Sequence, residues 1–156
     1  MASNTDRLSK HFTLREMTTT SSGLLNQPAS PQVLDNLRSL CSQILEPVRA
    51  HYERPVIIHS GYRSPDVNKA VGGSSASQHV KGEAVDFHVS GHSVYDLAIW
   101  ISNTLDYDQL ILENFLPGIP TSGWVHCSFA RNNRGQDLTK FKGSKMYHPG
   151  IILKPE

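Results

Sequence analysis

The chain has 156 residues and a formal net charge of +1 at pH 7, so one domain can bury its own core without disulfides or a structural metal. Positive and negative residues are mixed along the chain, and no apolar run is long enough to span a bilayer, which argues against nucleic-acid binding and membrane insertion. Two cysteines are too few for a disulfide framework, and no protein partner is evident.

The N-terminal region lacks the apolar segment of a secretory signal peptide, so we expect synthesis in the cytoplasm without one. We expect a single domain over residues 1–156, with residues 1–30 as an N-terminal extension that packs on the core. The Ser/Thr/Pro-rich residues 18–31, which overlap the end of that extension, are typical of a surface connection.

A long amphipathic helix is predicted next. Ser30 can cap it, Pro31 suits its first turn, and apolar residues recur at helical spacing as far as Val48. Pro47 is expected to bend its last turn or to end its hydrogen-bonded part early, because proline has no backbone N–H.

Short strands and helices alternate through the middle of the chain. Strands are predicted over 55–63, 83–89, 108–114 and 123–129, a brief helix over 64–73, and a second amphipathic helix over 93–105. A short loop joins the last two strands, which indicates an antiparallel pair and an α+β fold. Residues 131–156 are polar, basic and turn-rich, and we expect them to form a loop-rich C-terminal tail.

Alternation along two strands places polar side chains on one face of the sheet. Asp86 lies opposite the apolar Val85 and Phe87, and His126 lies opposite the apolar residues of its own strand. His79 comes from a loop just before the Asp86 strand. Two imidazoles and one carboxylate can hold zinc and leave a fourth position open, as in hydrolytic sites.

A zinc peptidase also needs a carboxylate beside the attacking water, to take its proton and pass it to the leaving amine. Glu113 is the candidate, since it ends the strand expected to pair with the His126 strand. Asp106 and Asp108 are the alternatives, although Asp106 is better explained as a residue that ends the preceding helix.

These residues stand in a motif that resembles a known family. The pattern S-x-H-x-x-G-x-A-x-D over residues 77–86, followed by W-V-H ending at His126, is similar to the zinc D-Ala-D-Ala peptidases, peptidase family M15. Residues 60–73, "SGYRSPDVNKAVGG", extend the similarity upstream, and "HFTLREM" with the helix to Val48 resembles the phage and prophage branch. The resemblance implies the fold shared with the hedgehog signalling domain: a small antiparallel sheet that carries one zinc ion and is flanked by helices.

The resemblance also implies roles for further residues. Arg63 would bind a substrate carboxylate or carbonyl, and Ser77 would support the substrate or the first metal ligand. Many relatives carry the catalytic acid three residues before the last histidine, a position that is Gly123 here, so the phage-branch resemblance assigns the acid to Glu113. From its place in the strand, Trp124 is expected in the wall of the site or in the core, with a second role in packing against the substrate. His88 is expected to be a hydrogen-bonding neighbour of the site and not a ligand.

The function expected from these features is a zinc peptidase that hydrolyses bonds next to D-amino acids in peptidoglycan stem peptides. Carboxypeptidase and endopeptidase action both remain open, as does the bond that is cut. A phage or prophage endolysin that reaches the cell wall through a holin pore, or a virion component, would fit a chain without a signal peptide. The alternative is an inactive zinc-binding module for cell-wall binding or tail assembly, since a fold alone does not establish activity.

Overall fold

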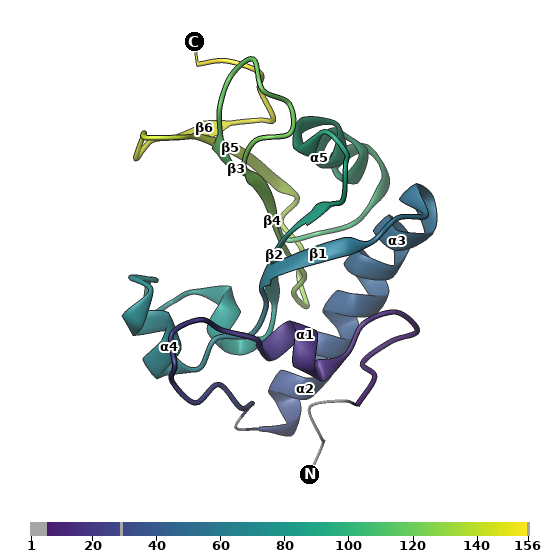
Figure 1. Cartoon of the computed structure of the whole chain (residues 1–156), viewed down its shortest axis with the longest axis vertical. Coiled ribbons are helices and arrows are strands. Elements are labelled where there is room, and N and C mark those ends of the chain that lie inside the picture. Colours follow the sequence, from purple (N-terminus) through teal and green to yellow (C-terminus); the bar gives the residue numbers. More distant parts are fainter. Residues whose placement is uncertain (1–5, 29, 156) are drawn as a thin grey trace.

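A six-stranded sheet forms the framework of the computed structural model, which describes residues 6–28 and 30–155. The strands are β1 (Val56–Ser60), β2 (Ala84–Val89), β3 (Gln109–Phe115), β4 (Trp124–Ser128), β5 (Gln136–Phe141) and β6 (Tyr147–Pro149). Their order across the sheet is β1-β2-β4-β3-β5-β6 (Figure 1), and every neighbouring pair is antiparallel except β3 with β5. The α+β class is therefore confirmed, and the sheet is mainly antiparallel with one parallel pair.

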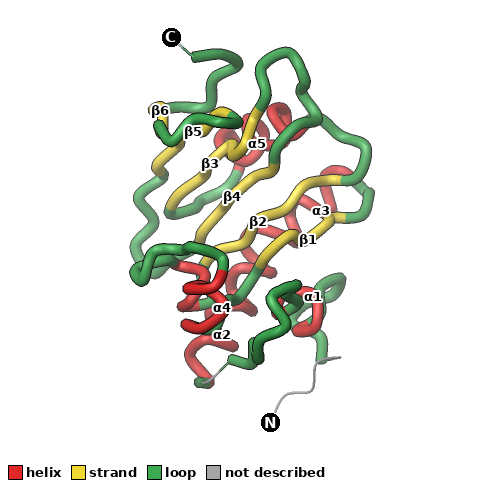
Figure 2. Tube along the Cα trace, turned by 60° about the vertical axis from the view of Figure 1, so that its left-hand side comes forward, coloured by secondary structure: helices red, strands yellow, loops and turns green. Residues whose placement is uncertain are grey.

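Seven helical segments accompany this sheet in the described part of the chain. They are α1 (Leu14–Thr18), α2 (Pro31–Leu40), η1 (Cys41–Leu45), α3 (Glu46–Tyr52), α4 (Pro65–Ala70), η2 (Gln78–Lys81) and α5 (Val94–Thr104). Figure 2 shows α3 and α5 behind the sheet, on the same side of it. Within residues 6–28 and 30–155, no helix has both the length and the hydropathy that crossing a bilayer requires.

The predicted long helix forms, but it runs past Pro47 to Tyr52. Its middle, η1, is a π-helical turn, and the Glu46 N–H bonds to the Cys41 carbonyl five residues earlier. Such a turn relieves the loss of the Pro47 N–H and the clash of its ring with the preceding turn. The early end of the helix, one of the two predicted effects of Pro47, is therefore wrong, and the other, a bend of the last turn, stays a prediction.

The hydrophobic core lies between the helices and the covered face of the sheet. As the alternation predicted, Val85, Phe87 and Val89 are buried on β2, and Leu110 and Leu112 are buried on the neighbouring part of the sheet. The polar residues of these strands consequently lie on the opposite face, where the candidate site is formed.

The two ends of the chain are more regular than their sequences indicate. Residues 131–156 contribute β5 and β6, so the prediction of a loop-rich tail is corrected. Only Thr139 and Phe141 are buried on β5, which is too few for a recognisable strand pattern, and backbone pairing with β3 supplies the order instead.

Near the N-terminus, a capping box between Thr13 and Glu16 begins α1. Residues 1–5, Ala29 and Glu156, parts of the predicted extension, connection and tail, lie outside the described residues.

Candidate metal centre

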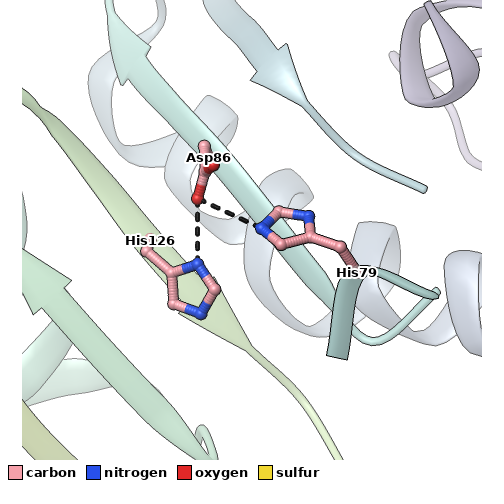
Figure 3. A group of neighbouring side chains, drawn as sticks. All are labelled: His79, Asp86 and His126. Atoms are coloured by element: carbon pink, nitrogen blue, oxygen red, sulfur yellow. Dashed lines mark hydrogen bonds and ion pairs between the residues drawn. The ribbon is translucent and has the colours of Figure 1, made fainter. Parts of the chain in front are cut away.

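Three side chains from three elements converge on the uncovered face of the sheet (Figure 3). Asp86 on β2 stands directly across from His126 on β4 in the antiparallel register, and His79 approaches from η2. Asp86 Oδ1 lies 2.9 Å from His126 Nδ1 and 3.5 Å from His79 Nε2. The candidate ligand atoms of the three residues all lie within 4.8 Å of one another, so one ion could contact all three.

The orientation of His79 is fixed from two directions. The Ser77 hydroxyl accepts a hydrogen bond from the His79 backbone N–H at 3.2 Å and caps η2. On the ring, Nδ1 lies 2.7 Å from the carbonyl oxygen of Gly61. A carbonyl can only accept, so Nδ1 carries the proton and Nε2 keeps its lone pair, as is usual for a metal-ligating histidine.

Gly82 allows the chain to turn from η2 towards β2. Its φ is +75°, and a Cβ added there would lie 2.9 Å from the Val33 carbonyl oxygen. Glycine therefore lets the loop that carries His79 pack closely on the first turn of α2 before the chain enters β2. The glycine of the motif is thus explained by backbone conformation and close approach.

The electrostatics of the cluster favour a negatively charged Asp86. Burial opposes its ionisation, but the hydrogen bond from His126 and the neighbouring imidazole of His79 outweigh burial and hold the pKa of the carboxyl well below its usual range. Burial likewise opposes charging of His126, yet its bond to Asp86 raises the pKa of this imidazole above its ordinary value. A cation between the three residues would replace the proton that His126 donates to Asp86.

This donor set fits zinc. Two imidazole nitrogens and one carboxylate oxygen are the donors that zinc accepts in catalytic sites, and three protein ligands leave a position for water or substrate. Calcium and magnesium prefer sites made of oxygen donors. Residues 79, 86 and 126 are the ligands predicted from the sequence, and the fold brings them together.

The cluster opens into a cavity of about 700 Å³. Its lining includes the three candidate ligands together with Arg63, Ser77 and Glu113. Arg63 is held by Ser60 and Asn68, and its Nη2 lies 3.5 Å from Asp86 Oδ2. The arginine therefore sits beside the cluster and also ties the turn after β1. Its predicted substrate contact stays a prediction. Trp124 is not among the residues that line this cavity.

Glu113 is the acidic residue best suited to proton transfer. Burial, with the charge of Asp86 as a second cause, raises the pKa of its carboxyl above the ordinary value of 4.5, as is common for catalytic acids and bases. Asp108 also lines the cavity, but Arg134 binds both of its oxygens at 2.9 and 3.0 Å and lowers its pKa. Asp106 lines a different cavity, beside Tyr107 and Gly135.

The structure explains why the acid cannot occupy position 123. Gly123 has φ +73°, and a Cβ there would lie 2.2 Å from the carbonyl oxygen of Glu113. A glutamate at this position is therefore excluded by backbone contact. Trp124, the residue after Gly123, pairs with Glu113 across the β3–β4 ladder. The neighbouring strand β3 therefore offers a carboxylate close to the place that a side chain at position 123 would occupy.

Replacing Gly123 by alanine is expected to destabilise the fold by about 3 kcal/mol, since a left-handed conformation costs roughly 1–2 kcal/mol and overpacking another 1–3. Gly118→Ala is the matched control, because Gly118 also has a positive φ, +87°, but nothing lies within 4 Å of its Cβ position. Urea unfolding of both variants measures the difference. Equal losses in the two variants would show that the contact with Glu113 carries no cost.

Further contacts around the site involve His88, His59, Gly61 and Asn68. His88 is not a member of the ligand group, and its Nδ1 lies 2.7 Å from His59 Nε2. Its role as a hydrogen-bonding neighbour of the metal site stays a prediction. The pairing with His59, the Gly61 carbonyl and the Asn68 amide were missed. These contacts involve β1, η2 and α4, and no spacing in the sequence links the three elements. In the sequence, only the segment "SGYRS" indicated that this part of the chain contributes to the site.

Comparison with known proteins adds an independent finding. Residues 10–128 match the family model described as Peptidase M15, a range that includes all three candidate metal ligands and Glu113. No curated protein matches the chain significantly. The match covers well over half of the chain and includes the His79–Asp86–His126 cluster, and we conclude that this chain belongs to the M15 family of peptidases.

Proposed function

We propose that this peptidase is zinc-dependent and cuts peptide bonds next to D-amino acids in peptidoglycan stem peptides. The observation that carries the proposal is the cluster of His79, Asp86 and His126, which opens into the cavity that Glu113 also lines. Bound zinc would supply a Lewis acid that polarises the scissile carbonyl and promotes ionisation of water.

The side chains around the cluster would do the remaining work. Glu113 takes a proton from the attacking water and delivers it to the departing amine, which balances the proton over the reaction. Arg63 holds a carboxylate or carbonyl of the substrate, for which its fork of N–H donors is suited. Ser77 keeps the backbone of His79 in place through the bond that caps η2.

The raised pKa of Glu113 has a consequence for the stability of the metal-free protein. A carboxyl whose pKa is higher in the folded state favours folding when it is protonated, and this contribution is lost as the pH rises through the folded-state value. Glu113→Gln, which stays neutral, should therefore stabilise the metal-free protein at pH 7, and the gain should shrink towards pH 4. Urea unfolding with chelator present measures it; a gain of equal size at both pH values would contradict the raised pKa.

Substrate class and location belong to the same proposal. Stem peptides are short, carry free carboxylates and contain D-residues, and an open cavity with an arginine beside the metal cluster suits such a ligand. We propose an endolysin-type role in a phage or prophage, with action on the cell wall after release through a holin or delivery with a virion. Both carboxypeptidase and endopeptidase action are compatible with this role.

Mass spectrometry of purified peptidoglycan fragments tests the proposal directly. The zinc-loaded protein is incubated with the fragments, and the chelated protein serves as the control. Loss of one alanine would identify a carboxypeptidase, and separation of cross-linked dimers would identify an endopeptidase. If several wall chemistries give no zinc-dependent product while one zinc stays bound per chain, the protein is instead an inactive binding or assembly module on the same fold.

A further inference from the structure

The C-terminal hairpin contributes to the cavity although it lies beyond the residues matched by the family model. That match ends at Ser128, whereas β5 and β6 span residues 136–149 with a turn between them. Tyr147 on β6 pairs with Lys140 on β5 and lines the same cavity as Glu113 and His126. The chain thus adds an aromatic side chain to the site from a segment outside the matched region.

The phenol of Tyr147 is available to a ligand. The residue is 48% exposed, and its hydroxyl makes no hydrogen bond to any residue in the described ranges 6–28 and 30–155. Burial of the ring, followed by the negative charges of Glu113 and Asp86, raises its pKa. The hydroxyl therefore stays protonated at neutral pH, close to the acids of the site, and can donate a hydrogen bond.

The position of Tyr147 complements that of Arg63. Arg63 follows β1 at one edge of the sheet, Tyr147 lies on β6 at the other edge, and the strands of Asp86, His126 and Glu113 lie between them. From β2, whose Asp86 lies beside Arg63, to β6, which carries Tyr147, the sheet spans four strand spacings, about 19 Å. An extended peptide of about six residues has that length.

We propose that Tyr147 is a substrate-binding residue, whose phenolic O–H donates a hydrogen bond to a backbone carbonyl of the bound peptide on the side of the site away from Arg63. The inference rests on the proposed peptidase function and adds one contact to it. The ligand would be a short peptide in an extended conformation, because only an extended chain presents a carbonyl at this rim while it passes over the metal cluster. The β5–β6 hairpin then forms one wall of the peptide site.

Tyr147→Phe removes the hydroxyl and keeps the ring, so it isolates the proposed hydrogen bond. One neutral hydrogen bond corresponds to about a 3- to 10-fold change in affinity. We expect KM for a peptidoglycan pentapeptide to rise by that factor with kcat nearly unchanged, since the contact is made in the ground state as well. Tyr95→Phe is the matched control: Tyr95 lies on α5, packs against Phe115, and is absent from the cavity lining.

A binding measurement separates this inference from the activity itself. Calorimetry on the zinc-loaded Glu113→Gln protein, with and without Tyr147→Phe, should show the same 3- to 10-fold loss of pentapeptide affinity. If the parent cleaves or binds the peptide and Tyr147→Phe matches it in KM and affinity, the role of Tyr147 is refuted and the proposed function stands. If the parent binds without cleaving, the affinity loss alone decides the role of Tyr147. If the parent neither cleaves nor binds any wall peptide, both proposals fall.

Discussion

Replacement of Glu113 by glutamine is expected to lower kcat by about 10²- to 10⁴-fold, the range that a positioned general acid–base contributes. Glutamine keeps the size and hydrogen-bonding capacity of the side chain but cannot accept the proton of the attacking water. Glu113 is not a member of the His79–Asp86–His126 group, so the variant should still bind one zinc per chain. Steady-state kinetics on wall peptides and metal analysis of the same preparation measure both effects.

The alternative acids provide the matched controls for this experiment. Asp106→Asn should retain full activity, because Asp106 lines a separate cavity. Asp108→Asn should release Arg134, which now binds both oxygens of Asp108, and should lower stability more than it lowers kcat. Full activity in Glu113→Gln together with a large loss in either aspartate variant would transfer the role of base to that aspartate.

Two of the three ligands could be predicted because the alternation of a β-strand applies to them. Alternation along a strand fixes which face a side chain occupies, and it placed Asp86 and His126 together once their strands paired. The pairing itself is not visible in either segment, but the shared family motif supplied it. The helix that begins at Ser30 and the capped α4 were predictable for a similar reason, since their start signals lie within four residues of sequence.

What the sequence could not predict depends on contacts between distant segments. The Gly61 carbonyl orients His79 across 18 positions of sequence, and any residue could supply such a carbonyl. β5 joins the sheet through backbone hydrogen bonds to β3, which leave no pattern in a polar segment. Trp124 shows that the face of a strand does not decide which site a side chain reaches. It shares a strand face with His126, yet its ring lies near His59 and is not part of the cavity lining.

Replacement of His126 by alanine should abolish metal binding at concentrations that saturate the parent protein. Removing one of three protein ligands leaves two donors, His79 and Asp86, and also breaks the 2.9 Å contact that holds Asp86. A metal that binds only the folded state stabilises it by about 2.7 kcal/mol at 100 times its Kd. For a domain of this size, that corresponds to a rise in Tm of roughly 5–10 °C, which the parent should show on zinc addition and His126→Ala should not.

His88→Ala is the control that makes this result specific. His88 is also an imidazole on a strand of the same sheet, and its partner is His59, outside the ligand group. Zinc should therefore raise the Tm of His88→Ala as much as that of the parent, whereas His126→Ala should show no shift and no peptidase activity. If zinc stabilised His126→Ala fully and His88→Ala not at all, the metal would be held by the His59–His88 pair, and the cluster at Asp86 would be an ion-paired structural site. The experiment thus decides between two groups of histidines. His79 and His126 line the cavity together with Glu113, whereas His59 and His88 do not.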